Sequence, residues 1–308
     1  MSTIVRHYSA LAALVVFLIC PAGHVYPAQQ DSQFKHLCTI SSLEGKGRLS
    51  NVQDVFWSKK RSRLLVTDTG GGRLLLFDQG EKSLRLVSEF KPEEMSTPVS
   101  AVETSDGKII AVERNAPGVL IYDSSGAILR VLKDGFPDAS SFVPTRLDLD
   151  EKDTLYVLDR GNRRICVFDA NLNYRFQIAA PDSGGFSAFA AGKDNIVVAL
   201  GSKNGTIYLF KDGKLARQFS GRGESRGETQ FPVDVALDPQ GSVYVVDSHG
   251  HRIAIFDRNG SFQGYIGEKG WKSGQFFFPV RIEISPDYRL FAVDADNGRL
   301  QVFQPARD

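Results

Sequence analysis

The stretch Val243-Tyr-Val-Val-Asp-Ser-His-Gly-His-Arg-Ile-Ala-Ile-Phe-Asp257 contains two short apolar runs separated by a polar turn. β-Branched and aromatic residues dominate both runs, which is typical of two paired β-strands. Leu155-Tyr-Val-Leu-Asp-Arg-Gly-Asn-Arg-Arg-Ile-Cys-Val-Phe-Asp169 repeats the pattern, including the acid that ends the first run and the aromatic in the second. A pattern that returns along a chain indicates a repeat architecture.

The same unit occurs six times, at a spacing of about 46 residues. In five copies an acid ends the run that corresponds to Val243–Asp247: Asp68, Glu113, Asp159, Asp247 and Asp294. Gly201 takes this place in the fourth copy. Nine residues after each of these positions stands an aromatic: Phe77, Tyr122, Phe168, Phe210, Phe256 and Phe303. Two independent markers in register make a chance similarity untenable.

Each copy contains short β-rich runs separated by turn residues such as Asn259-Gly260. Four antiparallel strands per repeat of this length are typical of a propeller blade. The sequence therefore predicts an all-β, six-bladed β-propeller over residues 34–304, with four antiparallel strands per blade. The blade repeats start near positions 52, 98, 144, 186, 232 and 279.

The sixth copy lacks a fourth strand, because the chain ends soon after Phe303. An unassigned strand, Phe34-Lys-His-Leu-Cys-Thr-Ile40, stands at the other end and resembles the fourth strand Phe262-Gln-Gly-Tyr-Ile-Gly267. We expect this N-terminal strand to complete the last blade, which would close the ring and remove an exposed sheet edge.

The quoted units resemble NHL repeats, as does the linker Gly221-Arg-Gly-Glu-Ser-Arg-Gly-Glu-Thr-Gln-Phe-Pro232. The resemblance covers about residues 34–304; blades 1, 3, 5 and 6 match well, whereas blades 2 and 4 have lost the Asp or the Arg. It implies a docking platform for proteins and, in some cases, RNA. A minority of similar propellers are metal enzymes, among them amidating lyases, paraoxonase-like hydrolases and strictosidine-synthase-like proteins.

The N-terminal segment differs from the repeats. Residues 11–20 form an unbroken apolar run that follows Arg6 and precedes Pro21, which is typical of a secretory signal peptide. We predict a signal peptide over residues 1–28 and an exported, periplasmic or extracellular protein without a membrane span in the mature chain. The alternative is an uncleaved segment that anchors the protein to a membrane.

Charge and cysteine content exclude several classes of protein. The chain has 37 Lys and Arg against 36 Asp and Glu, which argues against a nucleic-acid binder because phosphate neutralisation supplies most of that affinity. Cys38 and Cys166 lie in apolar runs and are expected to be buried. No Cys or His spacing suits zinc, so neither a metal nor another cofactor is predicted.

The innermost strands should bring one residue per blade to a mouth of the central channel: Asp54, Ser100, Arg146, Ala188, Asp234 and Arg281. Asp54, Arg146, Asp234 and Arg281 are the candidate channel-mouth residues. Two acids facing two arginines predict a charge-balanced ring or an anchor for a small polar ligand, and the arginines would repel a divalent cation. Two residues further along, Asp148 and Glu283 are too few for a carboxylate cage, though the pair could bind one cation weakly.

Four arginines stand five residues after a repeat acid and are expected to bond to it across the turn: Arg73, Arg164, Arg252 and Arg299. The candidates for partner binding lie outside this register, on the face formed by the blade linkers and the turns between second and third strands (the loop face). They are Arg160, Arg163, His249, His251, Arg222 and Arg226. The two histidines also occupy a position where the resembling repeat often has a His.

Repeat architecture accounts for most residues, so the function is the less constrained prediction. The main hypothesis is a non-enzymatic, exported binding or scaffold module that recognises a protein or anionic glycan through the loop face. The first alternative is a metal-dependent hydrolase or lyase with its site in the central channel. The second alternative is an RNA-binding propeller, which the neutral charge and predicted export disfavour.

Overall fold

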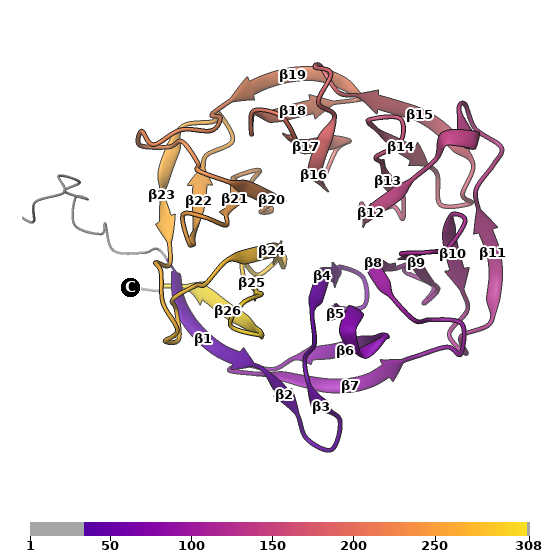
Figure 1. Ribbon diagram of the computed structural model, residues 1–308, viewed down its shortest axis with the longest axis horizontal. Coiled ribbons are helices and arrows are strands. Elements are labelled where there is room, and N and C mark those ends of the chain that lie inside the picture. Colours follow the sequence, from indigo (N-terminus) through magenta and orange to yellow (C-terminus); the bar gives the residue numbers. More distant parts are fainter. Residues whose placement is uncertain (1–33, 307–308) are drawn as a thin grey trace, which may run out of the picture. The chain divides into compact units, whose positions relative to one another are not determined.

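The computed structural model describes residues 34–306. Six four-stranded antiparallel sheets surround a central channel, which confirms the predicted six-bladed β-propeller (Figure 1). The predicted signal peptide over residues 1–28 lies outside the described residues. Within residues 34–306, no helix is long and apolar enough to cross a membrane.

Each blade places its four strands in sequence order from the channel outward, except that the outer strand of blade 6 comes from the N-terminus. The innermost strands are β4 (Val52–Ser58), β8 (Pro98–Glu103), β12 (Pro144–Leu149), β16 (Phe186–Ala191), β20 (Pro232–Leu237) and β24 (Pro279–Ile284). The second strands are β5 (Arg63–Asp68), β9 (Ile109–Glu113), β13 (Leu155–Asp159), β17 (Ile196–Gly201), β21 (Val243–Asp247) and β25 (Leu290–Asp294).

The remaining strands form the outer half of each blade. The third strands are β6 (Arg73–Gln79), β10 (Val119–Tyr122), β14 (Arg164–Phe168), β18 (Ile207–Lys211), β22 (Arg252–Phe256) and β26 (Arg299–Pro305). The outer strands are β7 (Leu84–Phe90), β11 (Ile128–Leu132), β15 (Tyr174–Ala179), β19 (Lys214–Phe219), β23 (Phe262–Ile266) and β1 (Phe34–Ile40). Short elements in the linkers and turns are the hairpin β2 (Ser42–Leu43) and β3 (Gly47–Arg48) and the 3₁₀ turns η1 (Thr69–Gly71) and η2 (Ala139–Ser141).

Strand β1 closes the ring, as predicted. It pairs antiparallel with β26, from Phe34 opposite Pro305 to Ile40 opposite Leu300. Phe34 is buried, and its ring meets Tyr244 edge-on with 5.9 Å between centroids. The N-terminal strand therefore provides both the outer strand of blade 6 and an apolar contact with blade 5.

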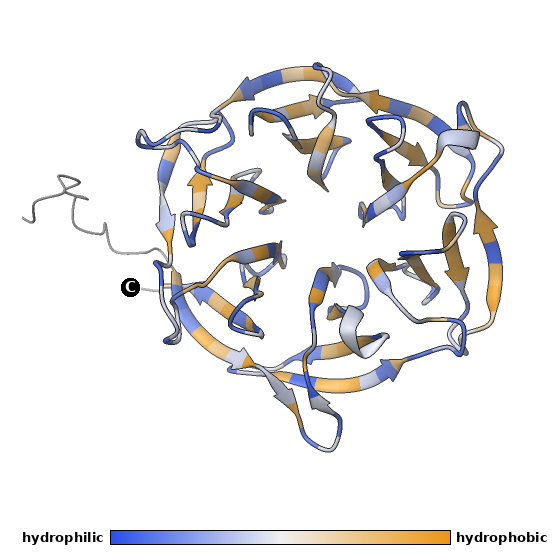
Figure 2. Ribbon diagram, viewed as in Figure 1, coloured by the Kyte–Doolittle hydropathy of each residue, from blue (hydrophilic) through white to orange (hydrophobic). Residues whose placement is uncertain are grey.

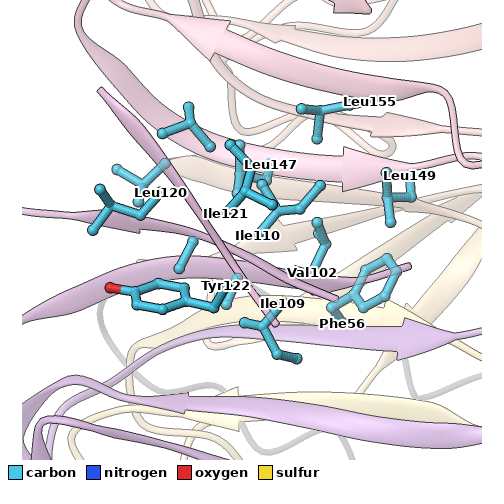
Figure 3. Packing of buried hydrophobic residues seen from close by; sticks show 14 of the residues in the cluster. Phe56, Val102, Ile109, Ile110, Leu120, Ile121, Tyr122, Leu147, Leu149 and Leu155 are labelled. Carbon is cyan, nitrogen blue, oxygen red and sulfur yellow. The ribbon is translucent and has the colours of Figure 1, made fainter. Parts of the chain in front are cut away.

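Apolar side chains fill the spaces between blades. Figure 2 shows hydrophobic residues concentrated in the middle strands of the blades, such as β10, β14 and β22, whereas polar and apolar residues alternate along the outer strands. Phe56, Ile110 and Leu147 belong to one cluster that spans blades 1 to 3 (Figure 3). Trp57 stacks on Phe291 at 5.6 Å and joins the first blade to the last. A blade cannot bury both of its faces alone, so the core exists only when neighbouring blades stack.

Each repeat acid, except in blade 4, ends a second strand and holds the linker that leads into its own blade. In blade 6, Asp294 accepts the Phe277 N–H at 2.7 Å and the Arg299 Nε–H at 2.7 Å. Arg299 then donates to the Trp271 and Lys272 carbonyls of the same linker. The predicted acid–arginine bonds are confirmed in the four blades that have the arginine: Arg73 with Asp68, Arg164 with Asp159, Arg252 with Asp247, and Arg299 with Asp294.

The two cysteines of the described chain are free thiols in different surroundings. Cys166 is fully buried, and this burial raises the pKa of its thiol to about 12. Cys38 is only half-buried on the closing strand, although its thiol pKa is also raised by desolvation. The outer position of β1 explains this difference, because one face of an outer strand meets solvent.

We expect deletion of residues 34–40 to destabilise the whole ring, because blade 6 would lose its outer strand and the link between the two ends. A chain that begins at Ser41 should unfold at a much lower temperature than one that begins at Ser32, measured by circular dichroism. Equal unfolding temperatures for the two chains would contradict this prediction.

Candidate functional site

The channel has two different mouths. The inner strands begin at the loop face and end at the opposite face, formed by the turns between first and second strands (the hairpin face). All six inner strands shift register at their second residue, for example between Pro232 and Asp234. A bulge of this kind changes the direction of the next side chain. In five of the six blades that side chain bonds to another of the six residues at the loop-face mouth of the channel, which are called the channel ring.

Opposite charges bond across the channel at this level. Arg146 donates to the Asp234 carboxylate, and Arg281 lies 3.3 Å from the same oxygen of Asp234. Arg281 also lies 3.2 Å from Asp54, which accepts the Ser100 hydroxyl at 2.5 Å. Four of these five side chains are buried, and Arg281 is nearly so. The ion pairs hold the loop-face end of the channel together and leave no free carboxylate there for a cation.

The acids of this ring are also fixed by backbone donors. Asp234 accepts the Ile282 N–H at 2.9 Å, and Asp54 accepts the Val55 N–H at 3.0 Å. Burial lowers the pKa of Arg146 to about 10, and the neighbouring Arg281 cation lowers it as well. Arg146 remains charged at neutral pH, because that value is still well above 7.

A pair of carboxyls lies one level deeper, toward the hairpin face. Asp148 and Glu283 line a cavity of about 20 Å³, together with Trp57, Lys59 and small residues of blades 4 and 5. The small residues are Ala190, Ala191 and Ala236. A cavity of this size holds about one water-sized group, so a reacting group, rather than a whole ligand, would fit there.

The two carboxyls have unusual acidity. Desolvation raises the pKa of Glu283 to about 8, and the negative charge of Asp148 raises it further, whereas Lys59 acts in the opposite direction. Desolvation also raises the pKa of Asp148. Asp148 accepts the N–H groups of Leu149 and Ala191, each at 2.7 Å, and both bonds favour its charged form. Both pKa values are therefore raised, and Asp148 is the carboxyl whose charged form two backbone N–H donors favour.

Lys59 marks the open end of the site. It follows β4 directly and lines the cavity of the carboxyl pair as well as a second cavity of about 10 Å³. Asp150 and Glu151, from the turn after β12, line the second cavity. Lys59 stands outside the repeat markers, so no sequence pattern singled it out.

Some propellers of the resembling type are metal enzymes, so the ligands that this site could offer a metal decide between two kinds of chemistry. The described residues contain no group of three or more His, Cys, Asp or Glu side chains arranged to hold a metal ion. Asp148 and Glu283 supply two carboxyls, whereas a tightly held Ca²⁺ takes six to eight oxygen ligands and catalytic zinc three protein ligands. The two carboxyls and Lys59 fit acid–base chemistry better than a resident metal.

The loop-face candidates divide into separate places. Arg160 and Arg163 are exposed in blade 3, where Arg163 donates to the Ser183 carbonyl at 2.8 Å. Arg226 is exposed and lies over the Phe262 ring on the outer strand of blade 5. Neither place contacts the channel carboxyls, and the role predicted for these residues stays a prediction.

The other three candidates meet at blades 5 and 6. His249 stacks on Phe231 at 4.5 Å, and Arg222 lies over the same Phe231 ring at 5.0 Å. His251 is buried, and its Nδ1 accepts the Phe278 N–H at 3.1 Å. Desolvation, with the nearby Lys269 and His249, lowers the pKa of His251, which keeps its imidazole neutral at neutral pH. The aromatic neighbours in the linkers were missed because only the histidines and charges were considered there.

Comparison with known proteins places the fold. Residues 229–256 match the NHL repeat model. A catalytically inactive variant of virginiamycin B lyase from Staphylococcus aureus, solved with quinupristin, is 15% identical with a TM-score of 0.58, covering 82% of this chain and 80% of that one. A gluconolactonase from Xanthomonas campestris is 13% identical with a TM-score of 0.61, covering 89% of each chain. No curated protein matches the sequence.

The class of protein is a six-bladed β-propeller closed by its N-terminal strand. More particularly, residues 229–256 in blade 5 match the NHL repeat model, and the similar solved structures are propellers. The identities of 13–15% establish the shared fold and nothing about activity.

Asp234→Asn should strongly destabilise the protein, because Arg146 would keep its charge in a buried place without its ion-pair partner and Arg281 would keep only Asp54. Breaking one side of a buried ion pair costs about 3–5 kcal/mol. Chemical denaturation followed by tryptophan fluorescence measures the free energy of unfolding. Asp257→Asn, on an exposed turn of the same blade, is the control; equal losses for the two variants would contradict the role of the ring.

The raised pKa of Glu283 predicts how stability depends on pH. Below its unfolded value of 4.5, Glu283 is protonated in both states and carries no penalty. Between that pH and about 8, the unfolded chain ionises while the folded protein retains the proton, so stability falls across this window. Glu283→Gln should remove this fall and gain unfolding temperature relative to wild type at pH 8.5, but not at pH 4.5. Parallel pH profiles would contradict the prediction.

Proposed function

We propose that the protein is a hydrolase or lyase that acts on a small polar molecule at the hairpin-face mouth of the channel. One observation carries the proposal: Asp148, Glu283 and Lys59, two acids of shifted pKa and a cation, converge on one cavity. Strongly perturbed groups that meet in a cavity are typical of catalytic sites.

The two carboxyls differ in a way that suits acid–base work. Asp148 holds its negative charge through two backbone N–H donors, so it is the candidate base. Glu283 keeps its proton to about pH 8, so it is the candidate acid that protonates a leaving oxygen or nitrogen. Environments that push the pKa values of neighbouring acids apart assign these two roles.

Lys59 supplies the third element. Its ammonium group lies close enough to both carboxyls to lower the pKa of each. At the mouth of the cavity it would bind a carbonyl or carboxylate oxygen of the substrate and stabilise negative charge that develops there. Substrates with an ester, lactone or activated carbon–oxygen bond fit this arrangement.

The fold is compatible with an enzyme in place of the non-enzymatic module favoured by the sequence. A lyase and a gluconolactonase are built on this fold, and both cover most of the present chain. The metal dependence of the original alternative is not part of the proposal, because the described residues offer no ligand set. Export through residues 1–28 stays a prediction.

The proposal is tested with purified protein on a panel of γ- and δ-lactones and p-nitrophenyl esters, followed by absorbance and pH-stat titration. Glu283→Gln and Asp148→Asn should each lower kcat by about 10²–10⁴-fold, the usual contribution of a general acid or base. Lys59→Met should raise KM or lower kcat for substrates with an anionic or carbonyl oxygen. The matched control is Glu224→Gln, an exposed carboxyl on the loop face.

A second measurement does not depend on the choice of substrate. Carbon-13 NMR titration of the labelled carboxyls reports the protonation of Glu283 and Asp148 directly. Retention of one proton by the pair at pH 7 is expected. Ionisation of both carboxyls below pH 5 would overturn the proposal, as would full activity of Glu283→Gln on any substrate that wild type converts.

A further inference from the structure

An aromatic surface on the loop face lies apart from the channel carboxyls. It comprises Phe231, His249, His251, Trp271, Phe277 and Phe278, and is called the aromatic platform below. Two linkers and the turn between β21 and β22 supply all six rings. Exposed apolar surface of this kind marks an interaction site more often than a structural one.

The platform consists of two stacks. In the first, His249 stacks on Phe231 with 4.5 Å between centroids and 17° between planes. In the second, Phe277 lies between His251 at 5.3 Å and Trp271 at 5.3 Å, with planes 13° and 28° apart. Phe278 meets His251 and His249 edge-on, at 4.6 and 5.7 Å, and joins the two stacks.

The second stack ends in an open ring. Trp271 is 71% exposed, more than any other large apolar side chain of the described residues. Phe277 covers one face of the indole, so the other face is available to a ligand. The surface presented there is flat and carries the negative potential of a π face.

The linker that carries Trp271 is held in place before any ligand binds. Arg299 donates to the carbonyls of Trp271, Lys272 and Gln275 at 2.8–2.9 Å. Phe278 adopts a φ of 52°, a left-handed conformation that bulky residues rarely accept. Strain that the surrounding structure imposes often marks a functional site, and here it fixes the ring that joins the stacks.

Positive charge surrounds the platform. Lys269 lies over the Phe277 ring at 5.8 Å, Arg222 lies over Phe231 at 5.0 Å, and Lys272 follows Trp271 directly. None of these three cations has a carboxylate within 4.0 Å among residues 34–306. A ligand with anionic groups would supply the counter-charge that the protein lacks there.

We propose that the aromatic platform binds an acidic oligosaccharide, with a sugar ring on Trp271 and its carboxylate between Lys269 and Lys272. The apolar C–H face of a pyranose matches one open π face, and a uronate carries its charge directly on the ring, beside the linker that bears both lysines. Single-stranded nucleic acid also stacks on aromatic rings, but it needs a long basic groove. The chain as a whole has 37 basic and 36 acidic residues, which favours the sugar.

The test uses oligogalacturonate and oligoguluronate hexamers as probes, with calorimetry and fluorescence. The chain has two tryptophans, and Trp57 is buried, so a change in quenching by acrylamide reports on Trp271. At least one hexamer should bind and protect Trp271. Trp271→Ala should weaken binding about tenfold or more, as expected for an aromatic anchor, and Trp271→Phe should restore part of it.

Separate variants test whether the two lysines bind the carboxylate of the sugar. Lys269→Ala combined with Lys272→Ala should weaken binding and flatten its dependence on salt, whereas Arg130→Ala, at an exposed cation on the outer strand of blade 2, should bind as wild type. Failure of both hexamers to bind would overturn the proposal. So would equal binding of neutral maltohexaose, or tighter binding of an oligothymidylate or a poly-glutamate peptide. Activity of the channel variants is independent of these outcomes.

Discussion

The arrangement of the blades depends on the hydrogen bonds that a buried carboxylate at the end of each second strand accepts from the linker. Asp247 accepts the N–H groups of Gln230 and Phe231, and so fixes the linker where it turns into the innermost strand. Asp294 does the same for Phe277. Because each linker leads directly into an inner strand, these bonds set where the channel ring begins. They also set the positions of the aromatic rings in the linkers. The channel site and the aromatic platform therefore depend on the same hydrogen bonds between the repeat acids and the linkers.

Blades 2 and 4 lack the full set of bonds between repeat acid, arginine and linker, and other contacts fix their linkers. Glu113 of blade 2 has no arginine partner; it accepts the Thr97 N–H at 2.8 Å, and desolvation raises its pKa. In blade 4, Asp182 bonds the Gly184 N–H and the Tyr208 hydroxyl. The carboxylate thus moves from the strand to the linker, and the blade keeps its place although the repeat pattern is lost. The aromatic platform coincides with neither of these blades but with blades 5 and 6, where the pattern is intact.

The repeat acids, their aromatics and the unassigned strand at residues 34–40 were enough to predict the blades, the ring closure and the acid–arginine bonds. The chemistry of the channel was harder to predict. A bulge in each inner strand, which no residue pattern announced, directs Asp234 and its equivalents inward. The pairing of Asp148 with Glu283 was noticed from the sequence, but their acidity comes from desolvation, a property of the whole ring. Lys59 and Trp271 lie outside the repeat markers, so only the structure revealed their neighbours.

The pairing of β1 with β26 has a consequence for how the protein is made. Phe34 opposes Pro305, so the first strand of the described residues pairs with the last one. Contacts between such distant segments form slowly, because the chain must lose the most entropy to bring them together. Blades 1 to 5 can assemble in order as they are synthesised, whereas β1 remains without its sheet until β26 has been made. The ring therefore closes only after every blade has been synthesised.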